Sequence, residues 1–193
     1  MKYSSHTKLI AFADDLAILT YGKMLPEAVA YTNSDLATIE KWAWDNKMKF
    51  NKSKCKAMII TRKRRRDKIN IFLNNRSLEQ FDVMKCLGIH FDSRLLFYKH
   101  TEQIAEKSRA LTYMLNRTAK LHWGLGHKSL KTVYEGVIVT LMTYGAPVWE
   151  VAITKHKYLQ KLQSAQRLIN TKIAKAYRTV SFEASCVVFE PHE

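Results

Sequence analysis

Two adjacent acidic residues interrupt the first apolar segment of the chain. Residues 9–19 read LIAFADDLAIL, so that Asp14 and Asp15 separate the short apolar runs Lys8–Ala13 and Leu16–Thr20. Two such runs around a polar pair are typical of a β-hairpin. Neither run alternates strictly between apolar and polar residues. We therefore expect both faces of the hairpin to be covered, as in the centre of an α/β sheet.

A helix and further strands are predicted after this hairpin. Pro26 and Glu27 suit a first helical turn, and the helix is expected to end near residues 45–46. The spacing of apolar residues places its inner face at Val29, Leu36, Ile39 and Ala43. Strands are expected at Met48–Asn51 and Lys56–Thr61, in a hairpin that turns at Asn74 and Asn75, and along Met84–Asp92, which would continue the sheet.

The periodicity is helical from about residue 100 onward. Apolar residues recur at helical intervals from His100 to Leu115, from Leu130 to Leu141 and across Lys155–Arg178. The middle segment ends at YGAPVW and is expected to pack through Leu130, Val137 and Leu141. A further helix begins in the tail VSFEASCVVFEPHE. The pattern predicts an α+β fold, with a sheet-rich first half, a helical second half and a border near residues 95–100.

The net charge of the chain is more informative about its partners than its length is. Among 193 residues, 32 are Lys or Arg and 17 are Asp or Glu, which gives a formal net charge of +15. This excess favours a polyanionic partner, most commonly nucleic acid, although a solvated basic surface is the alternative. The most basic run comprises Arg62, Lys63, Arg64, Arg65 and Arg66. It fits a solvated loop, a phosphate-contacting hairpin end or a nuclear localisation signal.

Several classes of site and location are disfavoured by the remaining composition. Cys55, Cys86 and Cys186 are odd in number and contain no C-x-x-C pair, which indicates reduced thiols in an intracellular protein, in the nucleus or cytoplasm. The longest later apolar stretch, from Gly136, contains a proline and is shorter than the ~20 residues that span a bilayer. No membrane partner is expected. The four tryptophans (Trp42, Trp44, Trp123 and Trp149) are expected to anchor cores and not to stack on bases.

The carboxylate pair is open to three interpretations on residue type alone. Asp14 and Asp15 fit an ordinary solvated turn, because Asp tolerates turn geometry. They also fit ion pairs with nearby lysines. Thirdly, they fit a site for a divalent cation, which prefers hard oxygen ligands. Spacing alone favours the solvated turn. The basic charge of the chain adds weight to the third interpretation, since a metal–carboxylate centre beside a polyanion is typical of two-metal phosphoryl transfer.

An ordered series of motifs extends this picture over most of the chain. FADD is followed by NKMKFNKSKCKAM, KCLGIHFD, LKTVYEGVIVTLMTYGAPVW and LQSAQRLINTKIAKAYRTVS. The series resembles the reverse transcriptase of non-LTR (LINE-like) retrotransposons, particularly the jockey-like and I-factor-like elements of arthropods. The resemblance covers Leu9 to Ser185. It implies a truncated polymerase palm sheet in residues 1–95, an all-helical thumb in 96–150 and a truncated helical post-thumb segment in 151–193.

The resemblance also implies roles for individual residues. Asp14 and Asp15 match the polymerase aspartates and would hold Mg²⁺, or Mn²⁺ in its place, for attack of a primer 3′-hydroxyl on a deoxynucleotide. Lys54 matches a lysine that would act on pyrophosphate, although a plain solvated lysine is equally expected. Lys85, Leu87 and Gly88 would form the primer grip, and Lys128 and Lys131 would face a duplex of RNA template and DNA primer.

The family pattern requires a third carboxylate on a strand before FADD. Only eleven residues precede Phe12, and none of them is acidic. We therefore expect the chain to be a C-terminal portion that lacks the N-terminal half of the polymerase and does not polymerise alone. The competing expectation is a non-catalytic basic nucleic-acid-binding module, or an expressed transposon relic.

Overall fold

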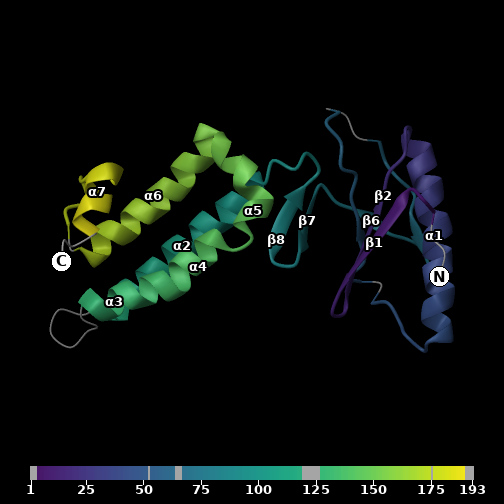
Figure 1. The fold of residues 1–193 in the computed structure, drawn as a ribbon, viewed down its shortest axis with the longest axis horizontal. Coiled ribbons are helices and arrows are strands. Elements are labelled where there is room, and N and C mark those ends of the chain that lie inside the picture. The colour runs from purple at the N-terminus through teal and green to yellow at the C-terminus, as the bar shows by residue number, and fades with distance from the viewer. Residues whose placement is uncertain (1–3, 52, 64–66, 119–126, 175, 190–193) are drawn as a thin grey trace. The chain divides into compact units, whose positions relative to one another are not determined.

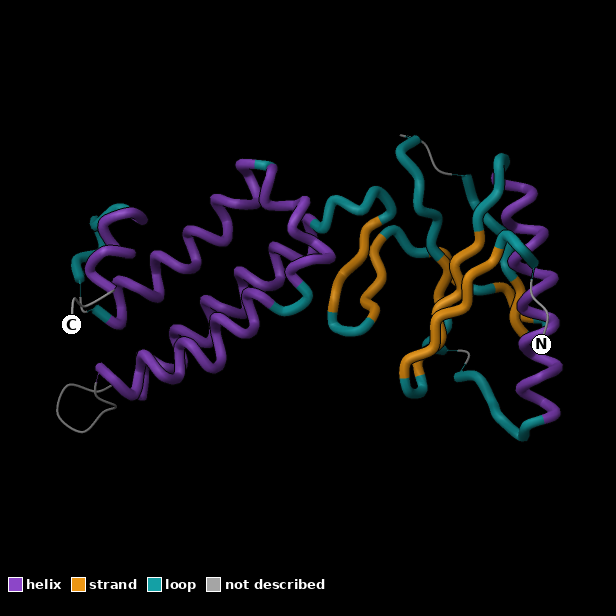
Figure 2. Tube along the Cα trace, viewed as in Figure 1, coloured by secondary structure: helices purple, strands orange, loops and turns teal. Residues whose placement is uncertain are grey.

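The computed structural model describes residues 4–51, 53–63, 67–118, 127–174 and 176–189. These residues form a mixture of helices and short strands, as the α+β expectation requires (Figures 1 and 2). The chain divides into two compact units, Met1–Met84 and Lys85–Glu193, which are described separately. The assignment of 1–95, 96–150 and 151–193 to palm, thumb and post-thumb segments remains a prediction.

The first unit opens with the expected hairpin. Strands β1 (Thr7–Phe12) and β2 (Asp15–Thr20) are antiparallel, and their register pairs Phe12 with Asp15 at the tip and Thr7 with Thr20 at the base. The hydroxyls of Thr7 and Thr20 lie 3.2 Å apart. The turn therefore contains only Ala13 and Asp14.

The expectation that both faces of this hairpin are covered is wrong. The apolar side chains of Ile10, Phe12, Leu16 and Leu19 are between 36% and 65% exposed. Within the described residues, β1 and β2 form a separate two-stranded sheet that no third strand joins. Ile18 packs against the apolar cluster beneath helix α1, but the other face of the hairpin has no covering layer among the described residues of this unit.

Helix α1 (Leu25–Asp45) follows the prediction closely at both ends. Pro26 lies in its first turn, where the missing N–H is not needed, and Glu27 accepts a hydrogen bond from the Met24 backbone N–H at 3.3 Å. At the C-terminus, the Asn46 side-chain amide donates to the Trp42 carbonyl at 2.8 Å.

The inner face of α1 is the one that the spacing predicts. Leu36, Ile39 and Ala43 are buried and Val29 is half-buried. Leu36 forms a cluster with Ile71 and Leu73. The core assignment of Trp42 and Trp44 is wrong, because they are 43% and 81% exposed. They flank buried Ala43 in sequence, and residues adjacent on a helix point in different directions.

The remaining strands of the first unit are shorter than predicted. Strands β3 (Lys56–Ala57) and β6 (Glu79–Gln80) are parallel, whereas β4 (Phe72–Leu73) and β5 (Arg76–Ser77) are antiparallel. The turn at Asn74 and Asn75 is confirmed, with φ values of 48° and 58°, as a primed two-residue turn requires.

The strand predicted at Met48–Asn51 is absent, and the one predicted at Lys56–Thr61 is reduced to two residues. Asn51 explains the first loss. Its side-chain oxygen accepts a hydrogen bond from the Ser53 backbone N–H at 3.1 Å, and its carbonyl accepts from the Lys54 N–H at 3.0 Å. Such local bonds favour a turn over a ladder.

The second unit begins inside a hairpin and is otherwise helical. Strands β7 (Val83–Cys86) and β8 (Ile89–Asp92) form their own two-stranded sheet, so the prediction that Met84–Asp92 continues the first sheet is wrong. The elements that follow are α2 (Tyr98–Thr118), α3 (His127–Val133), the π-helix η1 (Tyr134–Val139), α4 (Thr140–Thr143), α5 (Ala146–Trp149), the 3₁₀ helix η2 (Glu150–Thr154), α6 (His156–Ile173) and α7 (Phe182–Phe189).

Two apolar clusters organise this unit around α2 and α6. The first joins β8 to the helices through Ile89, Phe97, Ile104, Ala105, Trp149, Ala152, Leu162 and Ala165, and the second consists of Leu130, Tyr134, Ile138, Ile169 and Ile173. Leu130 is buried as expected, but Val137 is 47% exposed and Ile138 is fully buried in its place. The wider π-helical turn of η1 shifts the inward-facing position by one residue.

Among the described residues, no single helix combines the length and apolar composition of a membrane span. Among these residues, only the helical segments 129–143 and 146–154 have that length and composition when taken together, and they are bent by 41° where they join.

Candidate catalytic residues and nucleic-acid interface

The two aspartates occupy the exposed tip of the β1–β2 hairpin. Asp14 lies in the turn and Asp15 is the first residue of β2. Ala13 makes the turn possible with a positive φ of 52°, a conformation that residues with a side chain rarely adopt. Both carboxylates are exposed to solvent. The tip therefore presents two adjacent acidic groups outward.

This pair is suited to a hard cation but is not a complete cage. Carboxylate oxygens are the ligands that Mg²⁺ prefers, and a cation relieves the repulsion between neighbouring carboxylates. Within the part of the chain that the structure describes, no group of three or more His, Cys, Asp or Glu side chains gathers at one place. Asp14 and Asp15 thus supply two ligands, and further ligands are not found among those residues.

Lys54 lies on an exposed turn of the same unit. The turn is shaped by Asn51, which also accepts a hydrogen bond from the Cys55 thiol at 3.3 Å. Burial raises the pKa of the Cys55 thiol, so this cysteine stays protonated at neutral pH. The role of Lys54 on pyrophosphate stays a prediction.

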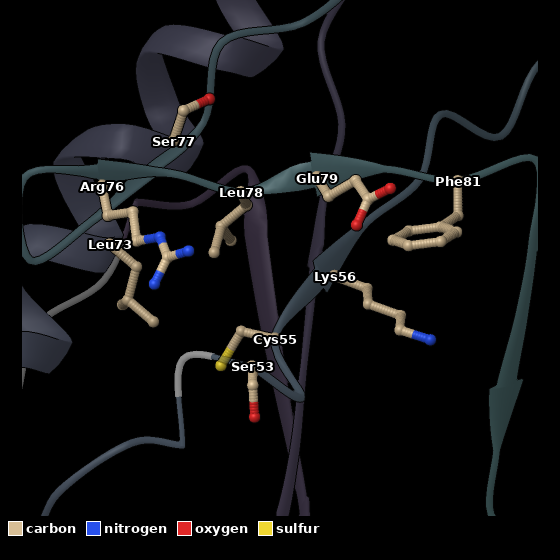
Figure 3. Close-up of a pocket in the computed structure, with 9 residues that line it drawn as sticks. All are labelled: Ser53, Cys55, Lys56, Leu73, Arg76, Ser77, Leu78, Glu79 and Phe81. Atoms are coloured by element: carbon tan, nitrogen blue, oxygen red, sulfur yellow. The ribbon is translucent and has the colours of Figure 1, made fainter.

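A small pocket of about 130 Å³ lies next to this turn (Figure 3). Its lining includes Lys56, Arg76 and Glu79, and the Lys56 ammonium lies 4.5 Å from the centre of the Phe81 ring. Lys54 does not line it. Ligand pockets usually measure about 300–1,000 Å³, so this pocket is too small to enclose a nucleotide.

The basic run is only partly described. Arg62 and Lys63 are exposed, and the Lys63 N–H donates to the Thr61 hydroxyl at 3.2 Å. The predicted contacts at Arg64, Arg65 and Arg66 lie outside the described residues. The exposed pair at 62–63 is consistent both with a phosphate contact and with a solvated loop.

The predicted primer-grip residues form the turn between β7 and β8. Leu87 and Gly88 have φ values of 46° and 84°, and the exposed Lys85 precedes them on β7. Tyr144 holds this turn. Its hydroxyl donates a hydrogen bond to the Leu87 carbonyl at 3.0 Å, and a Cβ atom on Gly88 would lie 3.0 Å from the Cε1 atom of the tyrosine ring. Glycine is therefore required by both the backbone and the close ring.

Tyr144 belongs to the YGAPVW segment, and sequence reasoning did not assign it a role. The segment is linked to the first apolar cluster through Trp149, whose indole N–H donates to the Tyr144 carbonyl at 2.9 Å. A signal for this link was present in the sequence, because KCLG and YGAPVW both belong to the ordered motif series. Only the structure brings the two segments together.

The buried His100 lies against Trp149 and next to the half-buried His90. The His100 ring packs edge-on against the indole at 5.5 Å between centroids, and its Nδ1 accepts a hydrogen bond from the His90 backbone N–H at 3.4 Å. Burial lowers the pKa of His100 to about 4, and the charges of His90 and Lys107 act in the same direction. Burial also lowers the pKa of His90. Both rings are therefore uncharged at neutral pH.

The predicted duplex-facing lysines belong to α3. Lys131 is half-buried and already takes part in an interaction with another group of the chain, which weakens the expectation that its ammonium is free for a duplex. Lys128 lies on the same helix, but its side chain is outside the described residues.

The candidate residues fall into two groups, one in each unit. Asp14, Asp15, Lys54 and the exposed part of the basic run belong to the first unit, whereas Lys85, Leu87, Gly88 and the α3 lysines belong to the second. Within each unit, the contacts join Leu87 and Gly88 to Tyr144, but they join Lys54 to neither aspartate.

Comparison with known proteins gives one consistent set of relatives. No family model matches the chain, and no solved structure gives a significant match. The chain is 32% identical over 196 residues to the retrovirus-related Pol polyprotein from type-1 retrotransposable element R1 4 of Nasonia vitripennis, an alignment that covers 92% of this chain and 49% of that protein.

Two Drosophila melanogaster proteins extend this set. The RNA-directed DNA polymerase from mobile element jockey is 25% identical, with 82% of this chain and 17% of that protein covered. The probable RNA-directed DNA polymerase from transposon X-element is 29% identical, with 81% and 17% covered. The chain spans about half the length of the first of these relatives and a smaller share of the other two. The chain is therefore similar, over most of its own length, to polyproteins of arthropod non-LTR retrotransposons, among them proteins named as RNA-directed DNA polymerases.

Proposed function

We propose that this chain forms the part of an RNA-directed DNA polymerase that carries two metal-binding aspartates and a surface for RNA template and DNA primer. The observation that carries the proposal is the hairpin tip, where Asp14 and Asp15 are adjacent and exposed. The names of the relatives support the reaction class, and the net charge of +15 supports a nucleic-acid partner.

In this proposal the residues of the chain have separate roles. Asp14 and Asp15 provide oxygen ligands for Mg²⁺, or for Mn²⁺ in its place. Two such ions would stabilise the negative charge on the attacking primer 3′-oxygen and on the leaving pyrophosphate during transfer of a deoxynucleotide. Lys54 offers an exposed ammonium to pyrophosphate. Lys85, Leu87 and Gly88 contact the primer backbone, and Arg62 and Lys63 contribute to phosphate binding.

We also propose that the metal site in this chain is incomplete. Two ions in an in-line displacement need more ligands than two side chains supply, and no third acidic, histidine or cysteine side chain joins the pair among the described residues. We propose that another part of the polymerase supplies the remaining carboxylate, and that this chain does not extend a primer alone.

Primer extension on poly(rA)/oligo(dT) with Mg²⁺ tests the proposal in two steps. The chain alone is expected to give no product, beside Asp15→Ala as a blank. Extension that Asp15→Ala abolishes would overturn the proposed incompleteness. When the N-terminal polymerase part of a related element is added in trans, extension is expected to appear and to be lost in Asp15→Ala. Asp67→Ala, which removes an exposed carboxylate of the same unit, should retain it.

Binding without extension distinguishes the alternative function. A chain that binds the hybrid duplex, yet shows no extension dependent on Asp15 after complementation, would be a non-catalytic nucleic-acid-binding module. That result would leave the exposed aspartates as solvated turn residues.

A further inference from the structure

We propose that Tyr144 is a positioning residue that holds the Leu87–Gly88 turn in the conformation that binds the sugar–phosphate backbone of a nucleic-acid strand. The inference rests on the proposed function, since it assigns that turn to nucleic-acid contact. It deepens that function by joining two sequence segments, KCLG and YGAPVW, into one binding element of the second unit.

The turn needs an external support because its backbone is strained. Leu87 has a φ of 46°, a region that residues with a side chain rarely adopt, and Gly88 follows at 84°. Strained residues persist only where surrounding contacts determine them. The Tyr144 hydroxyl provides such a contact 57 residues later in the chain, by donating to the Leu87 carbonyl at 3.0 Å.

Close packing between the two segments also holds the turn in place. The Tyr144 ring occupies the space that a Cβ on Gly88 would need, with its Cε1 atom 3.0 Å from that position. The next residue, Gly145, has a φ of 61°, and a Cβ there would lie 2.6 Å from the Cδ1 atom of Ile89. Ile89 directly follows the turn and is buried. Each of the two glycines thus receives a side chain from the opposite segment.

The backbone of Tyr144 is in turn held by a hydrogen bond from the apolar core. The indole N–H of the buried Trp149 donates to its carbonyl at 2.9 Å, and Trp149 belongs to the first apolar cluster with Phe97 and Leu162. The hydrogen bonds therefore run from the core, through the Tyr144 backbone and hydroxyl, to the turn. A change at the turn is resisted by the packed helices.

The supported surface has the chemistry of a backbone-binding element. Tyr144 is 53% exposed and Leu87 is 42% exposed, and Lys85 presents an exposed ammonium on β7. An ammonium neutralises a phosphate, a glycine permits close approach of a strand, and an aromatic face packs against sugar or base. Because the Tyr144 hydroxyl already donates to Leu87, its role is to position the turn and not to react.

Tyr144→Phe isolates this role, because it keeps the ring and removes only the hydroxyl. The full chain is titrated into a fluorescent RNA/DNA hybrid with a single-stranded template extension, and the Kd is measured by anisotropy. Affinity is expected to fall about fivefold, the factor equivalent to one net hydrogen bond. Tyr113→Phe on α2 is the matched control, since Tyr113 is 55% exposed, and it should bind like the unmodified chain.

A double-mutant cycle with Lys85→Ala separates positioning from a general structural effect. If Tyr144 acts through the turn, its loss should weaken binding less in the Lys85→Ala background than in the unmodified chain. A photoreactive thymidine at the primer terminus should also crosslink less to residues 85–89 in Tyr144→Phe. Gly88→Ala tests the same contact from the other side and should reduce affinity and crosslinking likewise.

The outcomes are distinct. Equal affinity of Tyr144→Phe and the unmodified chain, or strict additivity with Lys85→Ala, overturns the inference and leaves the proposed function intact. Absence of hybrid binding by the unmodified chain overturns the proposed nucleic-acid surface and the inference with it. Reduced affinity, reduced crosslinking and non-additivity together support the inference.

Discussion

At the scale of single residues, the exposed acidic tip depends on a backbone conformation that opposes the residue present. Ala13 has a φ of 52°, and a left-handed conformation costs about 1–2 kcal/mol for a residue with a Cβ atom. The antiparallel register, which pairs Phe12 with Asp15, leaves only two residues for the turn and so forces this conformation. Strain and the candidate metal ligands therefore coincide at one turn.

Ala13→Gly should relieve that strain. Because glycine adopts positive φ without steric penalty, the hairpin is expected to gain about 1 kcal/mol, measured as slower hydrogen exchange of the amides in residues 7–20. Ala11→Gly, in the middle of β1, is the matched control and should accelerate exchange, since glycine weakens a strand interior. Faster exchange in Ala13→Gly would contradict the argument.

The buried His100 should make stability depend on pH. Its pKa is about 4 in the folded chain, against an ordinary histidine pKa of 6.5 in the unfolded chain, so the unfolded chain binds the proton first as pH falls. The stabilisation is complete above pH 6.5 and is lost as pH falls toward 4. One pKa unit corresponds to about 1.4 kcal/mol, so the loss is on the order of 3 kcal/mol.

Urea unfolding at several pH values checks this dependence. Gln at position 100 does not titrate, so His100→Gln should flatten the curve between pH 6.5 and 4 and leave only the slope that His90 contributes, since its pKa is also lowered. The exposed His156, changed to Gln, is the control and should keep the full slope. An unchanged slope in His100→Gln would assign the effect to other groups.

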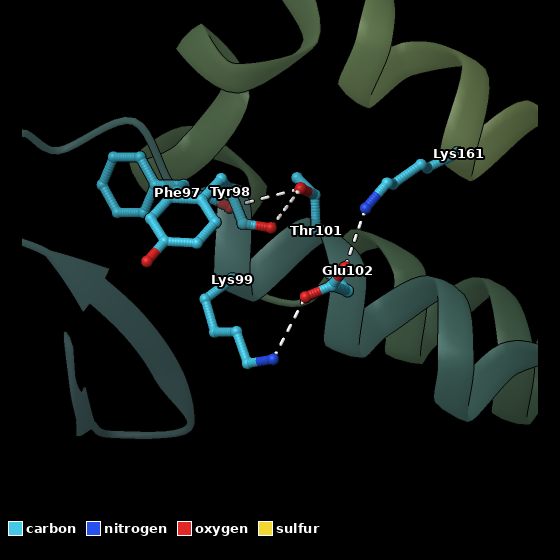
Figure 4. A network of polar contacts seen from close by, with 6 residues as sticks. All are labelled: Phe97, Tyr98, Lys99, Thr101, Glu102 and Lys161. Carbon is cyan, nitrogen blue, oxygen red and sulfur yellow. Dashed lines mark hydrogen bonds and ion pairs between the residues drawn. The ribbon is translucent and has the colours of Figure 1, made fainter.

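At the scale of elements, α2 and α6 are joined by an apolar interface and by one ionic link at its edge. Glu102 on α2 accepts from Lys161 on α6 at 2.8 Å and from Lys99 at 3.1 Å (Figure 4). These two lysines lower the pKa of Glu102 to about 2. The three side chains are each about one-third exposed or more, so solvent screens most of the attraction.

Glu102→Gln is therefore expected to cost less than about 1 kcal/mol of unfolding free energy, and this cost is complete above the carboxylate's unfolded pKa of 4.5. The difference should disappear as pH falls toward 2, because the carboxylate is then protonated in both states. Ile169→Ala in the second apolar cluster is the comparison, with an expected cost of about 2–5 kcal/mol. Denaturant unfolding monitored by helical circular dichroism measures both. A larger loss for Glu102→Gln would contradict this ranking.

The helix around η1 shows how an element can depart from its sequence period. The α-helical spacing places Val137 inside, whereas the π-helical turn buries Ile138 and exposes Val137. Tyr134 remains buried at the start of the same segment. A π-helical turn contains about one residue more than an α-helical turn, so the segments before and after η1 can both face the second apolar cluster.

At the scale of the whole molecule, the charge of +15 is the property most relevant to function. Each lysine or arginine that neutralises a phosphate releases counterions, so affinity for nucleic acid should fall linearly on a log–log plot against salt, by about 0.7–0.9 per contact. Replacing Arg62 and Lys63 by alanine should reduce the slope by about 1.4–1.8 if both contact phosphate. Anisotropy titrations at several salt concentrations between about 50 and 200 mM measure this slope. A flat dependence would remove nucleic acid as the partner.

Local features were predictable from sequence where short-range rules decide them. The β1–β2 hairpin, both ends of α1, the turn at Asn74–Asn75 and the burial of Leu36 each follow from turn chemistry, capping or helical period. Exposure was less predictable. Trp42, Trp44 and the apolar side chains of the hairpin are exposed although their residue types favour burial, because burial depends on a second layer that residue type does not encode.

The candidate residues divide in the same way. Asp14, Asp15, Lys85 and Gly88 could be selected from motif order alone. The structure places the two aspartates at the tip of the predicted hairpin, whereas the turn at Leu87 and Gly88 interrupts a segment that the pattern predicts as continuous strand. Tyr144 could not be selected, because its partner Leu87 is 57 residues away. The separation of the short strands into independent pairs was equally hidden, since pairing between distant strands depends on packing and not on the pattern of one strand.

The sequence by itself determined the reaction class to propose, the positions of the acidic pair and the helical second half, because motif order, charge and helical period are all read along the chain. Tertiary structure alone decided which side chains are exposed and which are held by contacts. It determined the exposure of the apolar side chains of the β1–β2 hairpin, the lowered pKa of the buried His100 and the contacts of Tyr144 with Leu87 and Gly88. These depend on atoms that meet across long sequence separations. No local pattern specifies such meetings, since they arise only when packed elements exclude water and fix each other's side chains.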